Sequence, residues 1–154
     1  MKESSNNRGF FGIGVYEPKF DENIGTLWRH AYLYNASFVF TIGARYKKQP
    51  TETSKSTRHI PLYYYETFKH FRDSIPINAE LLAIELADNS QCLSTFEHPD
   101  NAVYLLGSEG FGIPSEVLPE CESVIQIYSP KPQSMNVSTA GTIIMYDRAI
   151  KQRK

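Results

Sequence analysis

Two loops in the last third of the chain carry the residues best suited to binding a ligand. The first follows the apolar run 102–106, spans residues 107–114 and contains three glycines. The second follows the apolar run 124–127 and ends in Ser134 and Asn136. Glycine lets backbone N–H and C=O groups approach a ligand closely, because no side chain stands in the way. Ligands of open α/β sheets bind outside the carboxyl ends of strands, so we expect the two loops to form one site.

Other interpretations of these residues remain open. The glycines follow the spacing G-x-x-G-x-G, whereas the dinucleotide fingerprint is G-x-G-x-x-G, so a nicotinamide- or other nucleotide-binding enzyme is disfavoured. The glycine loop could simply be a turn between a strand and a helix that requires positive φ. Asn136 and Ser134, at the mouth of a helix, would by default be its N-cap and a neighbour of the N-cap.

Metal and nucleophile chemistry find little support in the sequence. The four histidines lie far apart without ligand spacing, so no zinc site is expected. No G-x-S-x-G motif is present, and neither Ser134 nor Ser138 has a recognisable catalytic partner. Cys92 and Cys121 form no C-x-x-C pair, and we expect both thiols to be reduced.

Three blocks of sequence carry a resemblance that covers nearly the whole chain, from about residue 12 to 150. They are Asn23-Ile24-Gly25-x3-Arg29, then Leu106-Gly107-Ser108-Glu109-Gly110-Phe111-Gly112-Ile113-Pro114, then Ile127-x6-Ser134-Met135-Asn136-Val137-Ser138. Each block alone is a weak signal, but all three in this order are quite specific. Together they resemble the motifs of the SpoU/TrmH branch of the SPOUT RNA methyltransferases. The compact chain is similar to the small TrmL-type members.

The resemblance implies a fold and a reaction that periodicity alone does not indicate. Such proteins have an α/β domain whose C-terminal segment is threaded through a loop, giving a deep trefoil knot, which is a rare exception to the usual connection rules. The resemblance also implies a homodimer that binds S-adenosylmethionine in the knot. The usual reaction moves a methyl group to a ribose 2′-hydroxyl of tRNA or rRNA and leaves S-adenosyl-L-homocysteine.

The resemblance also assigns residues to the site. Arg29 is expected to grip a phosphate and position the hydroxyl, since arginine stays protonated and is a poor base. Asn23 is expected to order the loop around Arg29, and Glu109 to orient Arg29 or Asn136. Ser134 and Asn136 would contact substrate or cofactor. Backbone and aliphatic groups suited to adenine are expected at Ile84, Glu85, Leu106, Gly107, Ile127, Ser134 and Met135.

The chain departs from the family pattern at a few positions. Proline is common at the places of Ser108 and Tyr128, and leucine at the place of Met135. The block from Ile127 to Ser134 is also one residue shorter than in TrmL-type members. These departures bear on the rigidity of the loops and on individual cofactor contacts more than on activity.

Charge is unevenly distributed along the chain, although the net charge is only -1. Between residues 44 and 72 seven lysines and arginines face only two glutamates, and the C-terminal tail is also basic. A solvated surface would explain this stretch, but an RNA contact would too. The predicted RNA-binding residues are Arg45, Lys47, Lys48, Lys55 and Arg58.

The elements that must position these residues alternate between strand and helix patterns. Strands are expected at 10–16, 37–42, 80–86, 102–106 and 124–127, with a short or edge strand within 60–65. Helices are expected to begin near Asp21 and to cover 66–73, 114–118 and about 136–152, with one helical turn at 93–96. This order predicts an α/β fold with a mostly parallel sheet flanked by helices.

Size and composition fit one domain, residues 9–154, after a disordered tail at 1–8. No apolar stretch is long enough for a membrane span, and the polar start does not resemble a signal peptide. We therefore expect a cytoplasmic protein. The alternative to an enzyme is a catalytically silent, knotted RNA-binding or assembly factor, which binding of S-adenosylmethionine would distinguish.

Overall fold

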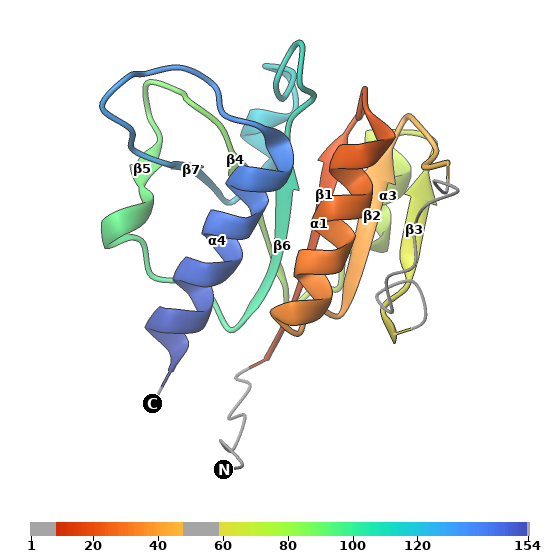
Figure 1. Ribbon diagram of the computed structural model, residues 1–154, viewed down its shortest axis with the longest axis horizontal. Coiled ribbons are helices and arrows are strands. Elements are labelled where there is room, and N and C mark those ends of the chain that lie inside the picture. Colours follow the sequence, from red (N-terminus) through yellow and green to blue (C-terminus); the bar gives the residue numbers. More distant parts are fainter. Residues whose placement is uncertain (1–8, 48–58, 154) are drawn as a thin grey trace.

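The protein is built on one parallel sheet. The computed structural model describes residues 9–47 and 59–153. Within them, neighbouring strands all run parallel in the order β3-β2-β1-β6-β4-β7-β5 (Figure 1). The strands are β1 (Phe10–Tyr16), β2 (Phe38–Ile42), β3 (Leu62–Tyr65), β4 (Glu80–Ile84), β5 (Gln91–Cys92), β6 (Asn101–Leu106) and β7 (Ser123–Gln126). The predicted α/β class is confirmed.

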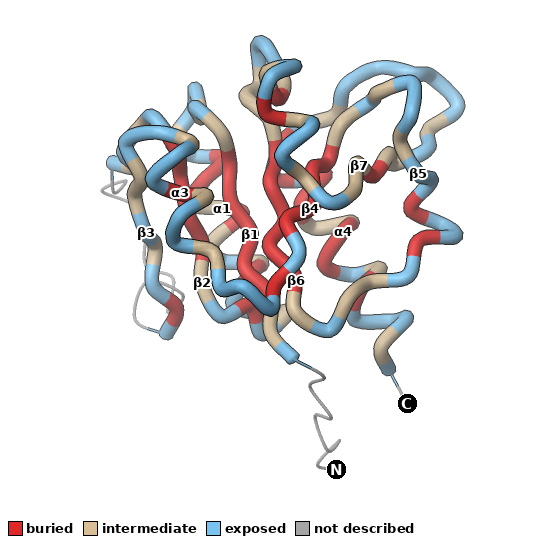
Figure 2. Tube along the Cα trace, turned by 180° about the vertical axis from the view of Figure 1, so that it is seen from behind, coloured by how far each residue is buried: buried red, intermediate tan, exposed pale blue. Residues whose placement is uncertain are grey.

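The central strands read as apolar runs because both of their faces are covered. In β6, residues 102–106 are all buried, and Figure 2 shows buried residues concentrated in β1, β6 and β4. The glycines of β1 make room for its neighbour: a Cβ on Gly12 would lie 2.2 Å from the Phe38 ring, and one on Gly14 would lie 2.2 Å from the Phe40 backbone oxygen. Larger residues at these two positions would push β2 away from β1.

Two helices cover one face of the sheet. These are α1 (Asp21–Leu33) and α4 (Val137–Gln152), which lie in front of the strands in Figure 1. Their apolar sides bury Leu27 and Ile144 against alternate strand residues such as Ile13. The helices approach closely where Gly141 of α4 meets α1, since a Cβ there would lie 2.5 Å from Leu27 Cδ1. This contact fixes the first helix against the last one.

The opposite face is covered by shorter elements. Helix α3 (Phe68–Ser74) and the 3-10 helix η2 (Leu118–Glu120) lie there, and a second core gathers Phe40 and Phe71 with Leu81. Leu81 and its neighbour Leu82 belong to different cores, as the alternation of side chains along a strand requires. On the face covered by α1 and α4, the 3-10 turn η1 (Leu93–Thr95) packs Leu93 into the first core and confirms the predicted helical turn.

The strand register brings three strand ends to one edge of the sheet. Ile84 of β4 is level with Leu106 of β6 and with Ile125 of β7. The loops that follow these strands therefore start side by side. This is the edge at which the sequence predicts a site.

Some local predictions differ from the structure. The strand expected at 80–86 ends at Ile84, and the Glu85 side chain after it bonds Ile113 in a neighbouring loop. A helix at 114–118 was wrong: a turn closed by Val117 N–H donating to the Pro114 carbonyl precedes η2, which has Pro119 near its start. Strand β5 has only two residues and gave no periodic signal.

Part of the predicted organisation falls outside the described residues. This applies to the tail 1–8 and to residues 48–58 within the basic stretch 44–72. None of the helices in the described part of the chain combines the length and apolarity needed to cross a membrane.

Candidate active site

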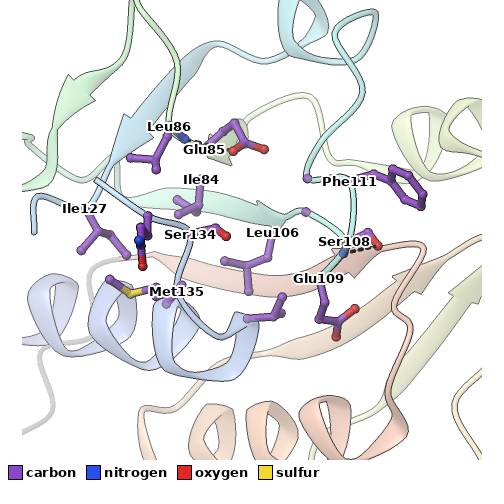
Figure 3. A pocket seen from close by; sticks show the side chains of 16 residues that line it. Ile84, Glu85, Leu86, Leu106, Ser108, Glu109, Phe111, Ile127, Ser134 and Met135 are labelled. Carbon is purple, nitrogen blue, oxygen red and sulfur yellow. Dashed lines mark hydrogen bonds between the residues drawn. The ribbon is translucent and has the colours of Figure 1, made fainter. Parts of the chain in front are cut away.

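A cavity of about 280 Å³ opens at the carboxyl edge of the sheet (Figure 3). The loops after β4, β6 and β7 and the first turn of α4 form its walls. The two loops that the sequence predicts to form one site thus meet at a single cavity. Every residue predicted to hold the cofactor lines it: Ile84, Glu85, Leu106, Gly107, Ile127, Ser134 and Met135.

One end of the cavity suits a flat, apolar ring with polar edges. Ile84 and Leu106 provide buried aliphatic surface, and Ile127 faces them from the next loop. Among the described residues, the backbone groups of Ser134 and Met135 make no hydrogen bond, so they are available to a ligand. Apolar walls with a few free backbone groups are a usual setting for an adenine ring.

The loop after β6, which we call the glycine loop (107–113), folds back on itself. Ser108 N–H donates to the Gly112 carbonyl at 3.3 Å, and Gly112 N–H donates to the Ser108 carbonyl at 2.9 Å. A Cβ on Gly107 would lie 2.4 Å from the Gly112 carbonyl carbon, and Gly112 itself has φ of 69°. The turn expected from these glycines is present, and it forms the wall of the cavity rather than merely joining two elements.

Glu85 holds the glycine loop from the neighbouring strand end. Its Oε2 accepts a hydrogen bond of 2.8 Å from the backbone N–H of Ile113, and its Oε1 accepts one of 3.1 Å from its own neighbour Leu86. A Cβ on Gly112 would lie 2.5 Å from the same Oε2. Glu85 therefore shapes the cavity as well as lining it, a role that its place at a strand end did not reveal.

A directed set of side-chain hydrogen bonds borders the cavity, and we call it the amide relay (Ser138, Asn136, Asn23, Glu109). Ser138 Oγ donates to Asn136 Oδ1 at 2.6 Å. Asn136 Nδ2 donates to Asn23 Oδ1 at 3.0 Å, and Asn23 Nδ2 donates to Glu109 Oε1 at 3.0 Å. Each amide donates toward Glu109, whose other oxygen accepts from the Lys19 backbone at 2.8 Å.

Asn136 has two roles at once. Its Oδ1 also accepts from Thr139 N–H at 3.2 Å, which makes it the N-cap of α4, as the default interpretation of the sequence had it. Its amide nitrogen remains free to reach Asn23. The structural and the site interpretations of Asn136 are therefore compatible.

The chain resembles known proteins over most of its length. The profile of the SpoU rRNA Methylase family matches residues 11–146. This chain belongs to that family. Among curated proteins, it is 33% identical over 73 residues to the Saccharomyces cerevisiae tRNA (guanosine(18)-2′-O)-methyltransferase; the match covers 46% of this chain and 5% of the yeast protein. The chain thus spans only a small part of that relative.

Solved structures share the fold at low sequence identity. The A. aeolicus TrmH/SpoU tRNA modifying enzyme has a TM-score of 0.81 at 18% identity, over 92% of this chain and 75% of that one. A protein whose structure concerns the 2-OH methylation of C/U34 on tRNA has a TM-score of 0.79 at 20% identity, over 94% of this chain and 97% of that one. The Streptomyces viridochromogenes SpoU methyltransferase AviRb, in complex with AdoMet, has a TM-score of 0.74 at 19% identity, over 93% and 58%.

Arg29 of this SpoU-family chain is exposed on α1, outside the amide relay. Among the described residues it makes no hydrogen bond and no ion pair. Glu109 does not contact Arg29, and it reaches Asn136 only through Asn23. Arg29 is therefore available to a group from outside the chain.

Of the predicted RNA-binding residues, two lie in the described part of the SpoU-family chain. Arg45 is exposed, and its guanidinium lies 4.0 Å from the centre of the Tyr64 ring. Lys47 is exposed, and its backbone N–H donates to Asp21 Oδ1 at 3.2 Å. Lys48, Lys55 and Arg58 lie outside the described residues.

A second polar cluster, absent from the sequence predictions, ties α4 to β6. His98 Nδ1 lies 2.7 Å from Tyr104 Oη, and its Nε2 lies 2.7 Å from Asp147 Oδ2. Arg148 donates to the carbonyls of Pro99 and Asp100, both at 2.8 Å. Burial lowers the pKa of His98 and outweighs the neighbouring carboxylate. His98 and Asp147 are 49 residues apart along the chain, so no local sequence pattern indicates that they pair.

Proposed function

We propose that this chain is an S-adenosylmethionine-dependent RNA ribose 2′-O-methyltransferase acting on tRNA or rRNA. The observation that carries the proposal is the cavity formed jointly by the glycine loop and the loop after β7, with the amide relay at its border. Membership of the SpoU rRNA Methylase family supports the same reaction.

S-adenosylmethionine, when bound, supplies a methyl group carried on a positively charged sulfur. When the methyl group is transferred, the sulfur keeps the electrons of the broken bond, and S-adenosyl-L-homocysteine is the leaving group. In-line displacement of this kind depends on alignment of the reacting groups more than on covalent help. The apolar wall of Ile84, Leu106 and Ile127, with the backbone at Gly107, Ser134 and Met135, would hold the adenosyl part. Glu85 would keep the glycine loop closed around it.

The remaining proposed residues act on the RNA. Arg29 grips a phosphate beside the target nucleotide and so presents the ribose hydroxyl. The amide relay fixes Asn136 and Glu109 at the border of the cavity through Asn23, while Ser134 contacts substrate or cofactor. The basic set Arg45, Lys47, Lys48, Lys55 and Arg58 holds the RNA backbone.

The finer architecture is part of the proposal. We propose one domain, residues 9–154, whose C-terminal segment is threaded as a trefoil knot. Two such chains form a homodimer, which could join two modest basic patches into one surface. A cytoplasmic location remains a prediction. Equilibrium sedimentation measures the proposed dimer directly, and a single-chain mass at micromolar concentration would contradict it.

Two measurements test the reaction. Transfer of labelled methyl groups from S-adenosylmethionine to RNA from cells lacking the protein should occur, and mass spectrometry should place the label on a ribose. Calorimetry should detect cofactor binding. A chain that binds RNA but no S-adenosylmethionine, even at millimolar concentration, would instead be the catalytically silent RNA-binding or assembly factor.

The role of Arg29 has its own test. In the Arg29→Lys variant, kcat should fall at least about tenfold, because lysine keeps the charge but not the two-pronged donor geometry. S-adenosylmethionine affinity should be unchanged, since Arg29 does not line the cavity. An Arg29→Lys enzyme with full activity would show that charge alone is sufficient and would reject this role.

A further inference from the structure

Phe111 stands almost fully in water. Its exposed fraction is 95%, the largest of any aromatic residue in the described part of the chain. Glycines flank it on both sides, and no aromatic or cationic side chain in the described residues packs on its ring. Exposure of so large an apolar side chain stabilises nothing in the free protein. Exposure alone does not indicate a partner, since Ile77 is also fully exposed, but Phe111 differs from Ile77 in lying at the cavity.

The loop that presents Phe111 is held firmly. The paired backbone hydrogen bonds of Ser108 and Gly112 close it, and Glu85 binds its far end through Ile113. Phe111 thus projects from a short, braced turn. A side chain presented in this way loses little conformational freedom when it meets a ligand.

The ring also lies on a particular side of the cavity. Phe111 is one of the residues that line the cavity, but its ring points away from the apolar end marked by Ile127 (Figure 3). It projects on the side of Ser108 and Glu109, where the amide relay ends. A nucleotide that brings its ribose to this border would place a base near Phe111.

We propose that Phe111 is a stacking platform for a base of the RNA at or next to the methylated nucleotide. This inference rests on the proposed function and adds a specificity-determining residue to it. Unpaired RNA bases commonly stack on exposed aromatic side chains. Glu109 is the charged residue of the glycine loop, so the loop does not attract phosphate, whereas the face of a neutral base meets no such repulsion.

A second copy of the chain is a weaker candidate for the partner of Phe111. A stable interface between proteins buries about 1,200–2,000 Å² in total, whereas one aromatic side chain provides about 150–250 Å². The residues flanking Phe111 are glycines, which add little apolar area. The RNA base is therefore the occupant that the surroundings favour.

The first test compares Phe111→Leu, which keeps an apolar side chain without an aromatic face, with Phe111→Trp, which keeps the face. The substrate is unfractionated tRNA and rRNA from cells lacking the protein. Phe111→Leu should raise KM for RNA about 5- to 100-fold, whereas S-adenosylmethionine affinity should change far less, because the ring points away from the apolar end of the cavity. Phe111→Trp should stay within about threefold of the natural chain. Ile77→Ala, which shortens an exposed apolar side chain at the other edge of the sheet, should change neither parameter.

The second test needs no turnover. The only tryptophan of the natural chain is Trp28, so the extra fluorescence of the Phe111→Trp variant reports on position 111. Single-stranded RNA should quench this extra signal through base stacking. Inorganic polyphosphate, which has charge but no bases, should not quench it.

The outcomes separate the two proposals. If the natural chain methylates RNA but Phe111→Leu has an unchanged KM, the stacking role fails and the reaction stands. Equal quenching by polyphosphate also overturns it. If Phe111→Leu alters the sedimenting mass rather than RNA affinity, Phe111 is a contact between copies, and the stacking role is wrong. If the natural chain labels no RNA, the proposed function fails, and this inference fails with it.

Discussion

At the scale of single residues, Asn23 has the central position. The residue is 9% exposed, and both polar atoms of its side chain are used: the oxygen accepts from Asn136 and the nitrogen donates to Glu109. Asparagine can do this because it has a donor and an acceptor on one short side chain. Neither aspartate nor leucine of similar size can replace both bonds.

The Asn23→Asp substitution tests that position. It would place a carboxylate oxygen 3.0 Å from Glu109 Oε1, where the amide nitrogen now donates. We expect the free energy of unfolding to fall by about 1–3 kcal/mol, because a partly buried hydrogen bond is replaced by repulsion. Methyl transfer should fall at least tenfold. Denaturant unfolding and methyl-transfer rates measure the two effects.

The matched control is Glu22→Gln at a neighbouring, exposed residue of α1. It removes one negative charge, whereas Asn23→Asp adds one. It should leave both quantities nearly unchanged, as surface substitutions usually do. Equal stability of the Asn23→Asp and natural chains would mean that the amide relay contributes nothing to holding the border of the cavity.

At the scale of elements, the glycine loop is the part whose shape the cavity depends on. Two of its glycines are required by close approach: Gly107 faces the backbone of Gly112, and Gly112 faces Glu85. A Cβ on the third, Gly110, would meet nothing within 4 Å. Gly110 can therefore serve as a control for substitutions at Gly107 and Gly112, because only those two positions exclude a side chain.

Gly107→Ala should therefore open the loop and weaken S-adenosylmethionine binding at least tenfold, because backbone at 2.4 Å from the new Cβ must move. Gly110→Ala should keep the melting temperature of the natural chain. Calorimetry and thermal unfolding measure these properties. Similar affinities for the natural and Gly107→Ala chains would separate the glycine loop from the binding site.

The His98 cluster is the second element-scale feature, since it attaches α4 to β6. Burial lowers the pKa of His98 below its ordinary value near 6.5, although Asp147 opposes the shift and Arg148 and Lys151 reinforce it. The folded chain thus binds fewer protons than the unfolded chain in this range. Stability should be highest above pH 6.5 and should decline as pH falls through the lowered pKa.

Thermal unfolding between about pH 8 and pH 5 tests this direction. The natural chain should lose more melting temperature over that range than His98→Gln, whose amide cannot take up a proton. His98→Gln should already be less stable at the alkaline end, because glutamine does not reproduce both hydrogen bonds. A variant with the same pH dependence as the natural chain would show that His98 is not the group responsible.

Much of this element-scale organisation could be predicted from the sequence. The apolar runs predicted the long strands, and the alternation with helices predicted the α/β class. The prediction was wrong at residues 114–118, because Pro114 suits a turn as well as a first helical position. It missed Gln91–Cys92, since a two-residue strand depends on its neighbour β7 rather than on its own pattern.

The sequence predicted which residues gather at the cavity, but it did not predict which of their side chains bond to one another. The motifs placed the glycine loop and Asn136 in one region, but they did not indicate that Glu109 meets Asn23 instead of Arg29. Glu109 and Asn23 are 86 residues apart along the chain, and their hydrogen bond depends on how α1 docks beside β6. Side-chain partners of this kind follow from packing, which periodicity does not encode.

At the scale of the whole molecule, the distribution of charge matters more than the sum. The net charge is -1, so general attraction to RNA is weak, and the proposed RNA binding would rely on local groups such as Arg45. Among the described residues, the Arg45 guanidinium lies over Tyr64 and forms no ion pair with an acid, which supports the proposal that it meets a phosphate. RNA affinity should therefore depend on salt through a small number of phosphate contacts.

We expect the logarithm of RNA affinity to fall linearly with the logarithm of salt concentration, while S-adenosylmethionine affinity changes little. Arg45→Ala should weaken RNA binding and reduce the slope by about one contact. Lys69→Ala, which removes a lysine paired with Asp73 at 2.8 Å, should reduce it less. Filter binding at several salt concentrations measures the slopes. A flat dependence would exclude the basic stretch as the main RNA contact.

The order of the chain has a consequence for how the cavity comes into being. Helix α4 follows every strand, yet it supplies Val137 and Ala140 to the cavity wall and brings Asn136 to Asn23. Without α4 docked on α1, the cavity lacks the wall formed by Val137 and Ala140, and the side-chain oxygen of Asn23 loses the donor that Asn136 provides. A chain in which α4 has not docked on α1 therefore lacks the complete cavity. Whatever occupies the cavity must, by mass action, shift the equilibrium toward the form in which the final helix is docked.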